Sequence, residues 1–359
     1  MKKIILTGGG TAGHVAPNLA LVPALKAAGY KIYYIGSHNG IERELVEAAG
    51  IQYFGISSGK LRRYKSFKNA TDIFRVSKGL FDALKIIRKI KPDVVFSKGG
   101  FVVVPVIAAA KLLRVKSVIH ESDMTPGLAN KLAMPFAAKI CVSFPETMTY
   151  IKASKGVVTG TPIRKQLLKG NMQTGFNFTK LNPNHNPVLL VTGGSTGAAA
   201  INASVREALP SLLKKFQIVH LCGKGNLADI SQEGYVQFEY VNDEMPHIFA
   251  MASLVISRAG ANTLFELIAL NKPNLIIPLP AAQSRGDQIQ NAASFKKQGF
   301  SLVLPEEELT AERLYKDALT LYETRNDFIS RMKEHDVTNG IKNVIDVIES
   351  AFVNTTTNE

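Results

Sequence analysis

The stretch TGGGTAGHVAP, residues 7–17, places a histidine directly after a glycine-rich turn. An apolar run, Ile4-Ile5-Leu6, precedes it, so we expect a strand, a turn and the start of a helix. In that arrangement free backbone N–H groups point at a bound anion. His14 beside them is a candidate general base, although an isolated histidine is more often a structural residue.

The spacing Gly8-x-Gly10-x-x-Gly13 is also that of dinucleotide-binding turns. Such a site needs an acidic residue about 20 positions further on, at the end of the second strand, to hold the ribose. Here the second predicted strand ends in Gly36-Ser37-His38, and the first acid is Glu42, inside the next helical pattern. The sequence therefore argues against a dinucleotide.

Three segments of the second half combine small residues, helix starts and polar side chains: GGSTG, SRAGANTLFE (257–266) and QSRGDQIQNA (283–292). A nucleoside diphosphate site explains all three together, although an ordinary helix cap explains the middle one alone. The candidate residues are Ser195, Arg258, Gly260, Ala261, Asn262, Thr263, Glu266, Arg285, Asp287, Gln288 and Asn291.

In the first half, HESDMTPGLANK (120–131) follows a predicted strand and supplies His120, Glu121, Asp123 and Asn130. Motifs that bind metals or nucleoside triphosphates are missing: the sequence has no Asp-x-Asp, no His pair four residues apart and no P-loop. We therefore expect no metal and no cofactor. Helix N-termini and cationic side chains would stabilise a leaving diphosphate.

The elements that position these residues alternate between strand-like runs and helical patterns, and the series restarts at NPVLLVTGGSTG. This predicts an α/β protein of two Rossmann-like, doubly wound domains facing each other across a cleft. Glycine and proline in TGTPIR mark the boundary, giving domains 1–160 and 161–337. A final amphipathic helix, about 338–353, could pack on either domain.

Composition limits the class of protein. The 359 residues are 46% hydrophobic, enough for two cores, and the two cysteines, Cys141 and Cys222, lie far apart in apolar surroundings. This favours a reducing compartment without disulfides. Neither a secretory signal nor a membrane-spanning run is evident, so a cytoplasmic location is expected.

The formal charge of +14 is concentrated between Lys60 and Lys91, which hold eleven basic and two acidic residues. A helix over 67–90 would put Phe74 and Phe81 on a broad apolar arc and Lys78 and Lys85 opposite. Either the helix packs on the core with a wet basic face, or it rests on an anionic membrane surface. Nucleic-acid binding is disfavoured, because the aromatic residues are not interleaved with the basic ones.

Seven segments together resemble one bacterial family, the UDP-N-acetylglucosamine–N-acetylmuramyl-(pentapeptide) pyrophosphoryl-undecaprenol N-acetylglucosaminyltransferases. In collinear order they are GGGTAGHVAPNLAL, SKGGFVVVP, HESDMTPGLANK, TGTPIR, GGSTGAAAIN, ISRAGANTLFEL and RGDQIQNA. The resemblance implies a two-domain glycosyltransferase fold of the B type. It implies inverting transfer of GlcNAc from UDP-GlcNAc to the muramyl 4-hydroxyl of lipid I, giving lipid II for the cell wall, and so for cell shape and division.

The resemblance also implies roles for individual residues. Thr11, Ala12 and Gly13 would approach the donor sugar, with His14 beside the reacting centre. Arg164 and Ser195 would contact the donor, Val241 the uracil, Glu266 the ribose and Gln288 the GlcNAc hydroxyls. Asp123 stands where part of the family has asparagine, so it keeps the ability to accept from a sugar hydroxyl but loses an amide donor.

The implied partners are UDP-GlcNAc, lipid I, anionic inner-leaflet lipids and other cell-wall synthesis proteins, at the cytoplasmic face of the membrane. Phe74, Lys78, Phe81 and Lys85 would contact the membrane. Two alternatives share the architecture: a UDP-GlcNAc epimerase and a diacylglycerol glycosyltransferase. The basic helix disfavours an epimerase, which would act on soluble sugars and need no membrane contact. It does not disfavour the diacylglycerol glycosyltransferase.

Overall fold

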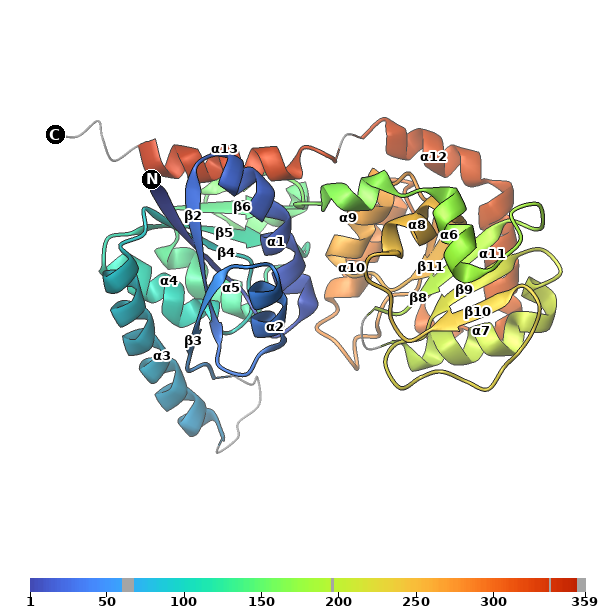
Figure 1. Ribbon diagram of the computed structural model, residues 1–359, viewed down its shortest axis with the longest axis horizontal. Coiled ribbons are helices and arrows are strands. Elements are labelled where there is room, and N and C mark those ends of the chain that lie inside the picture. Colours follow the sequence, from blue (N-terminus) through green and yellow to red (C-terminus); the bar gives the residue numbers. More distant parts are fainter. Residues whose placement is uncertain (60–67, 195–196, 336, 354–359) are drawn as a thin grey trace. The chain divides into compact units, whose positions relative to one another are not determined.

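The computed structural model describes residues 1–59, 68–194, 197–335 and 337–353 (Figure 1). The chain forms two compact units, of which the first spans residues 1–163 and resumes at 338, and the second spans 164–337. The boundary predicted at residue 160 lies a few residues before the one in the structure, which follows Ile163. Thr161 stays with the first unit because its hydroxyl lies 2.6 Å from that of Ser143.

Unit 1 is built on a parallel sheet with the strand order β3-β2-β1-β4-β5-β6-β7. The strands are β1 (Lys2–Thr7), β2 (Tyr30–Ser37), β3 (Gln52–Ile56), β4 (Val94–Ser97), β5 (Lys116–Glu121), β6 (Lys139–Val142) and β7 (Gly156–Val158). All but the short β7 coincide with apolar runs that predict strands.

Both faces of this sheet are covered, which is why its strands read as continuous apolar runs. Ile4 and Leu6 pack with residues of α1 (Ala12–Ala27), α2 (Ile41–Ala48) and α13 (Gly340–Val353). Ile5, between them in the sequence, packs on the opposite face with α3 (Lys68–Ile90), α4 (Val103–Leu112) and α5 (Leu128–Ala133). Short 3-10 helices η1 (Met134–Phe136) and η2 (Pro145–Tyr150) complete the unit.

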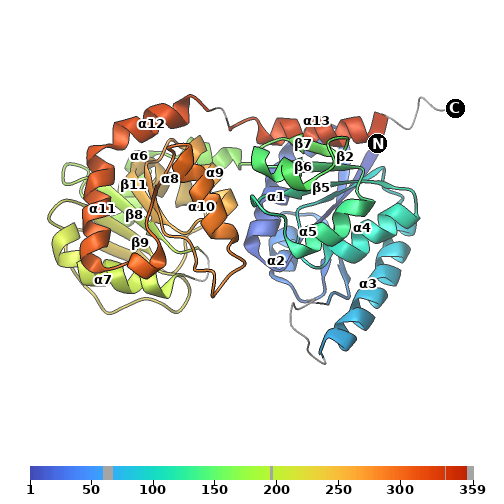
Figure 2. The same ribbon diagram turned by 180° about the vertical axis from the view of Figure 1, so that it is seen from behind.

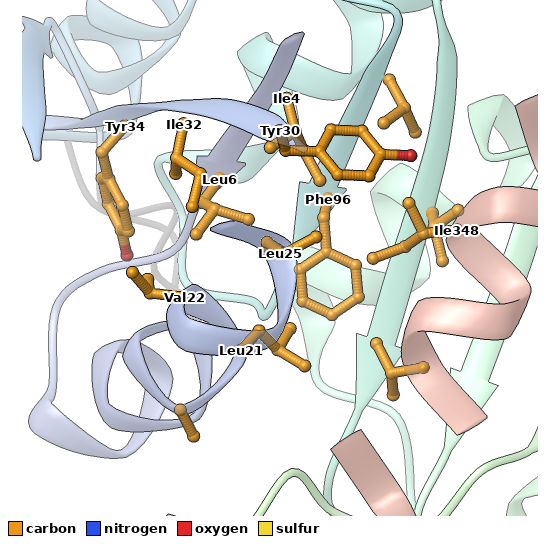
Figure 3. Close-up of a cluster of buried hydrophobic side chains, with 14 of the residues drawn as sticks. Ile4, Leu6, Leu21, Val22, Leu25, Tyr30, Ile32, Tyr34, Phe96 and Ile348 are labelled. Atoms are coloured by element: carbon orange, nitrogen blue, oxygen red, sulfur yellow. The ribbon is translucent and has the colours of Figure 1, made fainter. Parts of the chain in front are cut away.

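The final helix, which the sequence could assign to either domain, belongs to unit 1. Val344 and Ile348 of α13 are fully buried in the cluster that contains Leu25 and Phe96. Figure 3 shows Ile348 directed toward Phe96 and Leu25. The chain therefore leaves unit 1 after Ile163 and returns to complete its core.

Unit 2 repeats the design with the strand order β10-β9-β8-β11-β12-β13, again parallel. Its strands are β8 (Val188–Thr192), β9 (Gln217–Leu221), β10 (Tyr235–Phe238), β11 (Ala252–Ser257), β12 (Asn274–Ile276) and β13 (Leu302–Val303). The helices are α6 (Met172–Thr179), α7 (Ala199–Leu212), α8 (Met245–Met251), α9 (Ala261–Ala269), α10 (Asp287–Lys297), α11 (Ala311–Glu323) and α12 (Arg325–Lys333), with η3 (Lys165–Lys169) and η4 (Glu306–Glu308). The predicted pair of doubly wound α/β domains is confirmed.

Helix α3 lies along one side of unit 1 next to α4 (Figure 2). Ala83, Ile87 and Ile90 are buried against the sheet, whereas Phe74 is 77% and Phe81 69% exposed. The predicted apolar arc is thus divided between a core-facing part and an outward aromatic part. The expectation that Lys78 and Lys85 lie opposite Phe74 and Phe81 is wrong. Residues four apart on a helix are neighbours, so Lys78 lies beside Phe74 and Lys85 beside Phe81, and all four are exposed. No helix in the described ranges is long and apolar enough to cross a bilayer.

Candidate active site

The strand order of unit 1 reverses beside β1, between β1 and β4, where doubly wound sheets open a crevice at the carboxyl edge. The turns that follow these two strands are packed backbone to backbone. Gly9 N donates to Gly99 O at 3.2 Å, and a Cβ on Gly100 would collide with the carbonyl of Gly9. This close approach explains the paired glycines of SKGGF.

His14 lies in the first turn of α1 and is half-buried. A Cβ placed on Gly99 would lie 3.2 Å from both Nδ1 and Cε1 of His14, and 3.6 Å from Nδ2 of Asn130. The imidazole therefore packs against the Gly99 backbone, near the Asn130 amide. The two turns and α5 together position it.

Glu121, at the end of β5, is buried and surrounded by donors. Its carboxylate accepts from Asp123 N at 3.0 Å, Gly127 N at 2.9 Å and Asn130 Nδ2 at 2.9 Å. These bonds fix the loop 122–127 and occupy the carboxylate. Asp123, by contrast, is partly exposed, so of the two acids it is the one that a substrate can reach.

A buried lysine, Lys98, supports the same edge of the sheet. Its Nζ lies 2.7 Å from His120 Nδ1 and donates to the Ser122 hydroxyl. His120 Nε2 is 2.8 Å from the carbonyl of Gly160, so the cluster joins the ends of β4, β5 and β7. Burial lowers the pKa of Lys98 to about 7, although the Glu121 and Asp123 carboxylates oppose that shift. Sequence reasoning missed Lys98; the one available signal was a lysine directly after the apolar run VVFS.

In unit 2 the three segments predicted to form a nucleoside site follow β8, β11 and β12, which are neighbours in the sheet. They therefore leave the same carboxyl edge. The side-chain oxygen Oε1 of Gln288 accepts from Ala259 N at 3.2 Å and Leu279 N at 3.1 Å, and Asn291 Nδ2 donates to Ala259 O at 3.2 Å. Because the side-chain oxygen of Gln288 is already hydrogen-bonded, the side-chain NH2 group is what remains to donate to a ligand.

The N-terminus of α9 has the features of an anion site. Gly260 is its N-cap, followed by buried Ala261 and half-buried Asn262 and Thr263. The first turn of α9, which is described in full, carries no acidic side chain. Gly260 has φ −66°, which any residue adopts, and a Cβ there would meet no described atom within 4 Å. The glycine thus keeps the space in front of the helix N-terminus open.

Glu266, one turn into α9, faces Arg164 with Oε1 3.9 Å from Nη2. Burial raises the pKa of Glu266 and the Arg164 charge opposes this. The Glu266 side chain remains 20% exposed, so a ligand can reach it. The pair offers an acceptor for hydroxyl groups next to a cation.

Other predicted residues are engaged elsewhere or lie outside the description. Arg258 forms a partly exposed ion pair with Glu306 and donates to the carbonyls of Ile277 and Pro278 at 3.2 and 3.3 Å. Arg285 pairs with Asp287 at 3.2 Å. Val241 is buried and follows β10, two strands from β8. Ser195 and the side chain of Ala12 lie outside the described residues. Across the described ranges, no three His, Cys, Asp or Glu side chains are grouped as metal ligands.

The chain matches the two domains of one enzyme family. The N-terminal domain of glycosyltransferase family 28 matches residues 4–142 and the C-terminal domain matches residues 188–348. In Clostridium botulinum, a UDP-N-acetylglucosamine–N-acetylmuramyl-(pentapeptide) pyrophosphoryl-undecaprenol N-acetylglucosamine transferase is 57% identical over 351 residues, which are 97% of this chain and 99% of that protein.

Two solved structures share the fold. MurG of Acinetobacter baumannii superposes with a TM-score of 0.77 at 25% identity, covering 98% of this chain and 100% of that one. The UDP-GlcNAc 2-epimerase of Neisseria meningitidis, solved with UDP-GlcNAc, has a TM-score of 0.69 at 13% identity, covering 98% and 100%. The epimerase shows a shared fold only. From its identity over nearly the full length of both chains, this protein belongs to the family of UDP-N-acetylglucosamine–N-acetylmuramyl-(pentapeptide) pyrophosphoryl-undecaprenol N-acetylglucosamine transferases.

Proposed function

We propose that this protein transfers GlcNAc from UDP-GlcNAc to the muramyl 4-hydroxyl of undecaprenyl-pyrophosphoryl-MurNAc-pentapeptide, lipid I, and so makes lipid II for peptidoglycan. The observation that carries the proposal is the 57% identity to a transferase of that name across 97% of the chain. Neither alternative is favoured, because the 57% identity is to a UDP-N-acetylglucosamine–N-acetylmuramyl-(pentapeptide) pyrophosphoryl-undecaprenol N-acetylglucosamine transferase, whereas the epimerase shares only the fold.

The direct test is incubation of the purified protein with lipid I and UDP-GlcNAc labelled in the sugar. Label should appear in the butanol-extractable lipid fraction. Omission of lipid I, and its replacement by diacylglycerol, are the controls. Label transferred to diacylglycerol, or conversion of free UDP-GlcNAc to an epimer, would replace this function by one of the alternatives.

The chemistry is one inverting displacement. The muramyl 4-hydroxyl oxygen attacks the anomeric carbon, the bond from that carbon to UDP breaks, and UDP leaves with the electron pair. The hydroxyl proton passes to a base, for which we propose His14. Thr11, Ala12, Gly13 and Asp123 would contact the sugar at the same edge of unit 1.

The donor would be held by unit 2. Its diphosphate would lie against the N-terminus of α9, at Gly260, Ala261, Asn262 and Thr263, and near Ser195, where helix N–H groups favour negative charge. Glu266 would accept from the ribose hydroxyls, with Arg164 beside it. Gln288 would donate to the GlcNAc hydroxyls, and the backbone at Val241 would bind the uracil.

Gly260→Ala tests the place of the diphosphate. The fold should tolerate the change, because φ is −66° and the added Cβ meets no described atom within 4 Å, so the melting temperature should move by less than about 2 °C. A diphosphate against the helix N-terminus would collide with the methyl group. We expect UDP affinity to fall at least about tenfold in calorimetry, which is about 1.4 kcal/mol. Uridine, which lacks phosphates, is the control ligand and should bind both proteins alike. Equal losses for uridine and UDP would place the diphosphate elsewhere.

We propose that α3 holds the protein on the cytoplasmic face of the membrane, where lipid I would be reached. Phe74 and Phe81 are exposed beside Lys78 and Lys85, the combination that binds anionic lipid surfaces. Contact with other cell-wall synthesis proteins is compatible with this location.

Liposomes with anionic lipid should therefore sediment the protein at low salt and release it as salt rises, because surface attraction is screened. Phe74→Ser with Phe81→Ser, and separately Lys78→Gln with Lys85→Gln, should each reduce the bound fraction without changing UDP affinity. The matched control is Lys214→Gln with Lys215→Gln, which removes the same charge from exposed sites on unit 2. If the control pair reduces binding as much as the α3 pairs, net charge and not α3 is responsible.

A further inference from the structure

In the glycine turn after β1, the backbone N–H groups that a phosphate would need already donate to acceptors of the protein. In dinucleotide-binding turns these N–H groups point at the pyrophosphate. Here Gly9 N donates to Gly99 O at 3.2 Å, and Gly10 N donates to Glu42 Oε2 at 3.1 Å. The acceptor for Gly10 is thus a carboxylate of the protein itself.

Glu42 is held in this position from several directions. It is fully buried at the start of α2, and its other oxygen accepts from the amide and the hydroxyl of Ser37, at 2.9 and 2.5 Å. Burial opposes ionisation of Glu42, but these hydrogen bonds and that from Gly10 outweigh it and lower its pKa. The group inside the turn is therefore a carboxylate anion at neutral pH.

Three glycines from separate segments make room for this carboxylate. A Cβ on Gly9 would lie 2.5 Å from Glu42 Oε1, and a Cβ on Gly36 or Gly40 would also collide with the Glu42 side chain. Gly10, whose N–H donates to Glu42, has φ 87°, and a Cβ there would meet no described atom within 4 Å. The turn is therefore filled by the Glu42 carboxylate at the Gly10 N–H and open in the direction of a Gly10 side chain.

We propose that Glu42 is a specificity-determining and positioning residue, whose carboxylate fills the anion site of the first glycine turn, excludes phosphate from it and leaves the turn to neutral sugar hydroxyls. The inference rests on the proposed function, in which both substrates carry diphosphates. A turn that bound phosphate would compete with unit 2 for the donor. The same bond fixes Gly10, and through it Thr11 and the first turn of α1 with His14.

The kinetic test compares Glu42→Gln with Glu44→Gln, which changes an exposed acid on the same helix. The glutamine keeps the shape of Glu42, loses its charge and can accept at one oxygen only. We expect kcat to fall at least about tenfold while KM for UDP-GlcNAc stays within about twofold, because the UDP part of the donor would be bound by unit 2. Glu44→Gln should change neither. A kcat within about twofold of wild type in a folded Glu42→Gln protein would overturn the positioning role.

A binding test needs no transferase activity. Inorganic pyrophosphate is titrated into protein labelled with 15N-glycine, and the amide resonance of Gly10 is followed. In wild type that resonance should stay in place, whereas in Glu42→Ala, which frees the amide, it should shift with increasing pyrophosphate. If Glu42→Ala does not fold, Glu42→Gln serves, with a smaller shift expected.

A Gly10 shift in wild type, or no shift in a folded variant, would overturn the exclusion of phosphate. Failure of the proposed function would look different. Lipid I would then stay unlabelled with the wild-type protein, while the Gly10 titration would still decide the role of Glu42.

Discussion

Replacing His14 with alanine should lower kcat for GlcNAc transfer by about two orders of magnitude or more and leave UDP affinity unchanged. A positioned base contributes typically about 10²–10⁴-fold to a step that removes a proton from the attacking hydroxyl. His14 is partly exposed at the carboxyl edge of unit 1, and UDP would bind unit 2. Single-turnover rates with lipid I, together with calorimetry for UDP, separate the two effects.

The control variant for this experiment is His185→Ala, which removes an exposed histidine from a loop of unit 2. It should change neither the rate nor the affinity. A fall of less than about fivefold in a folded His14→Ala protein would exclude His14 as the base.

The rival bases are the two carboxylates that follow β5. Glu121 is a poor candidate, since three donors already surround it within 3.0 Å. Asp123 is partly exposed and remains the alternative. Asp123→Asn keeps the size and removes the basicity, so it should cost much less than His14→Ala. The reverse order of effects would transfer the role to Asp123.

The sequence predicts the fold well because the central strands, such as β1, β4 and β8, are buried on both faces. Ile4, Ile5 and Leu6 all contact core, so the run is apolar throughout and easily recognised. β7 has only three residues and two valines, too little pattern to predict a strand. The place of α13 could not be predicted, because an amphipathic face shows that a helix packs but not on which domain.

The sequence could predict which segments of the chain meet at the site, because this depends only on the order of strands and helices. Parallel strands end at a common edge, so the segments around Ser195, Gly260 and Gln288 had to leave the same side of a sheet. What could not be predicted are contacts between distant residues. Glu42 is 32 residues from Gly10 and lies within a helical pattern, so its sequence position gave no sign that its carboxylate turns back to the glycine turn.

Glu42 is a contact that the sequence did not indicate. Arg258 is the reverse case, a residue that the sequence marks as a candidate for ligand binding but whose side chain makes structural contacts. Its place before a helix N-terminus made it a candidate for the nucleoside diphosphate site. The structure directs the guanidinium to Glu306 and to two carbonyls after β12. Sequence spacing indicates which residues are near the edge of a sheet, but hydrogen-bond partners decide which of them are available to a ligand.

Glu266→Ala should weaken UDP and UDP-GlcNAc binding by about 10- to 100-fold, the range expected when a charged hydrogen-bond partner of a ligand is lost. The control is 2′-deoxy-UDP. If Glu266 accepts from the ribose 2′-hydroxyl, the variant should lose much less affinity for the deoxy ligand, which never made that bond. Equal losses for both ligands would mean that Glu266 does not contact this hydroxyl.

The same contact predicts a pH dependence. The ionised carboxylate of Glu266 is the form that accepts from the ribose, and burial raises its pKa. Affinity should therefore be full above that raised pKa and fall as pH drops through it, beginning at a higher pH than for an ordinary glutamate. UDP-GlcNAc is the ligand to use, since the terminal phosphate of UDP itself titrates near pH 6.

Arg164→Ala removes the charge that opposes the shift, so it should raise the pKa of Glu266 further and move the loss of affinity to higher pH. Glu266→Gln should bind more weakly and without this pH dependence; if its affinity falls with pH as that of wild type does, another group is titrating.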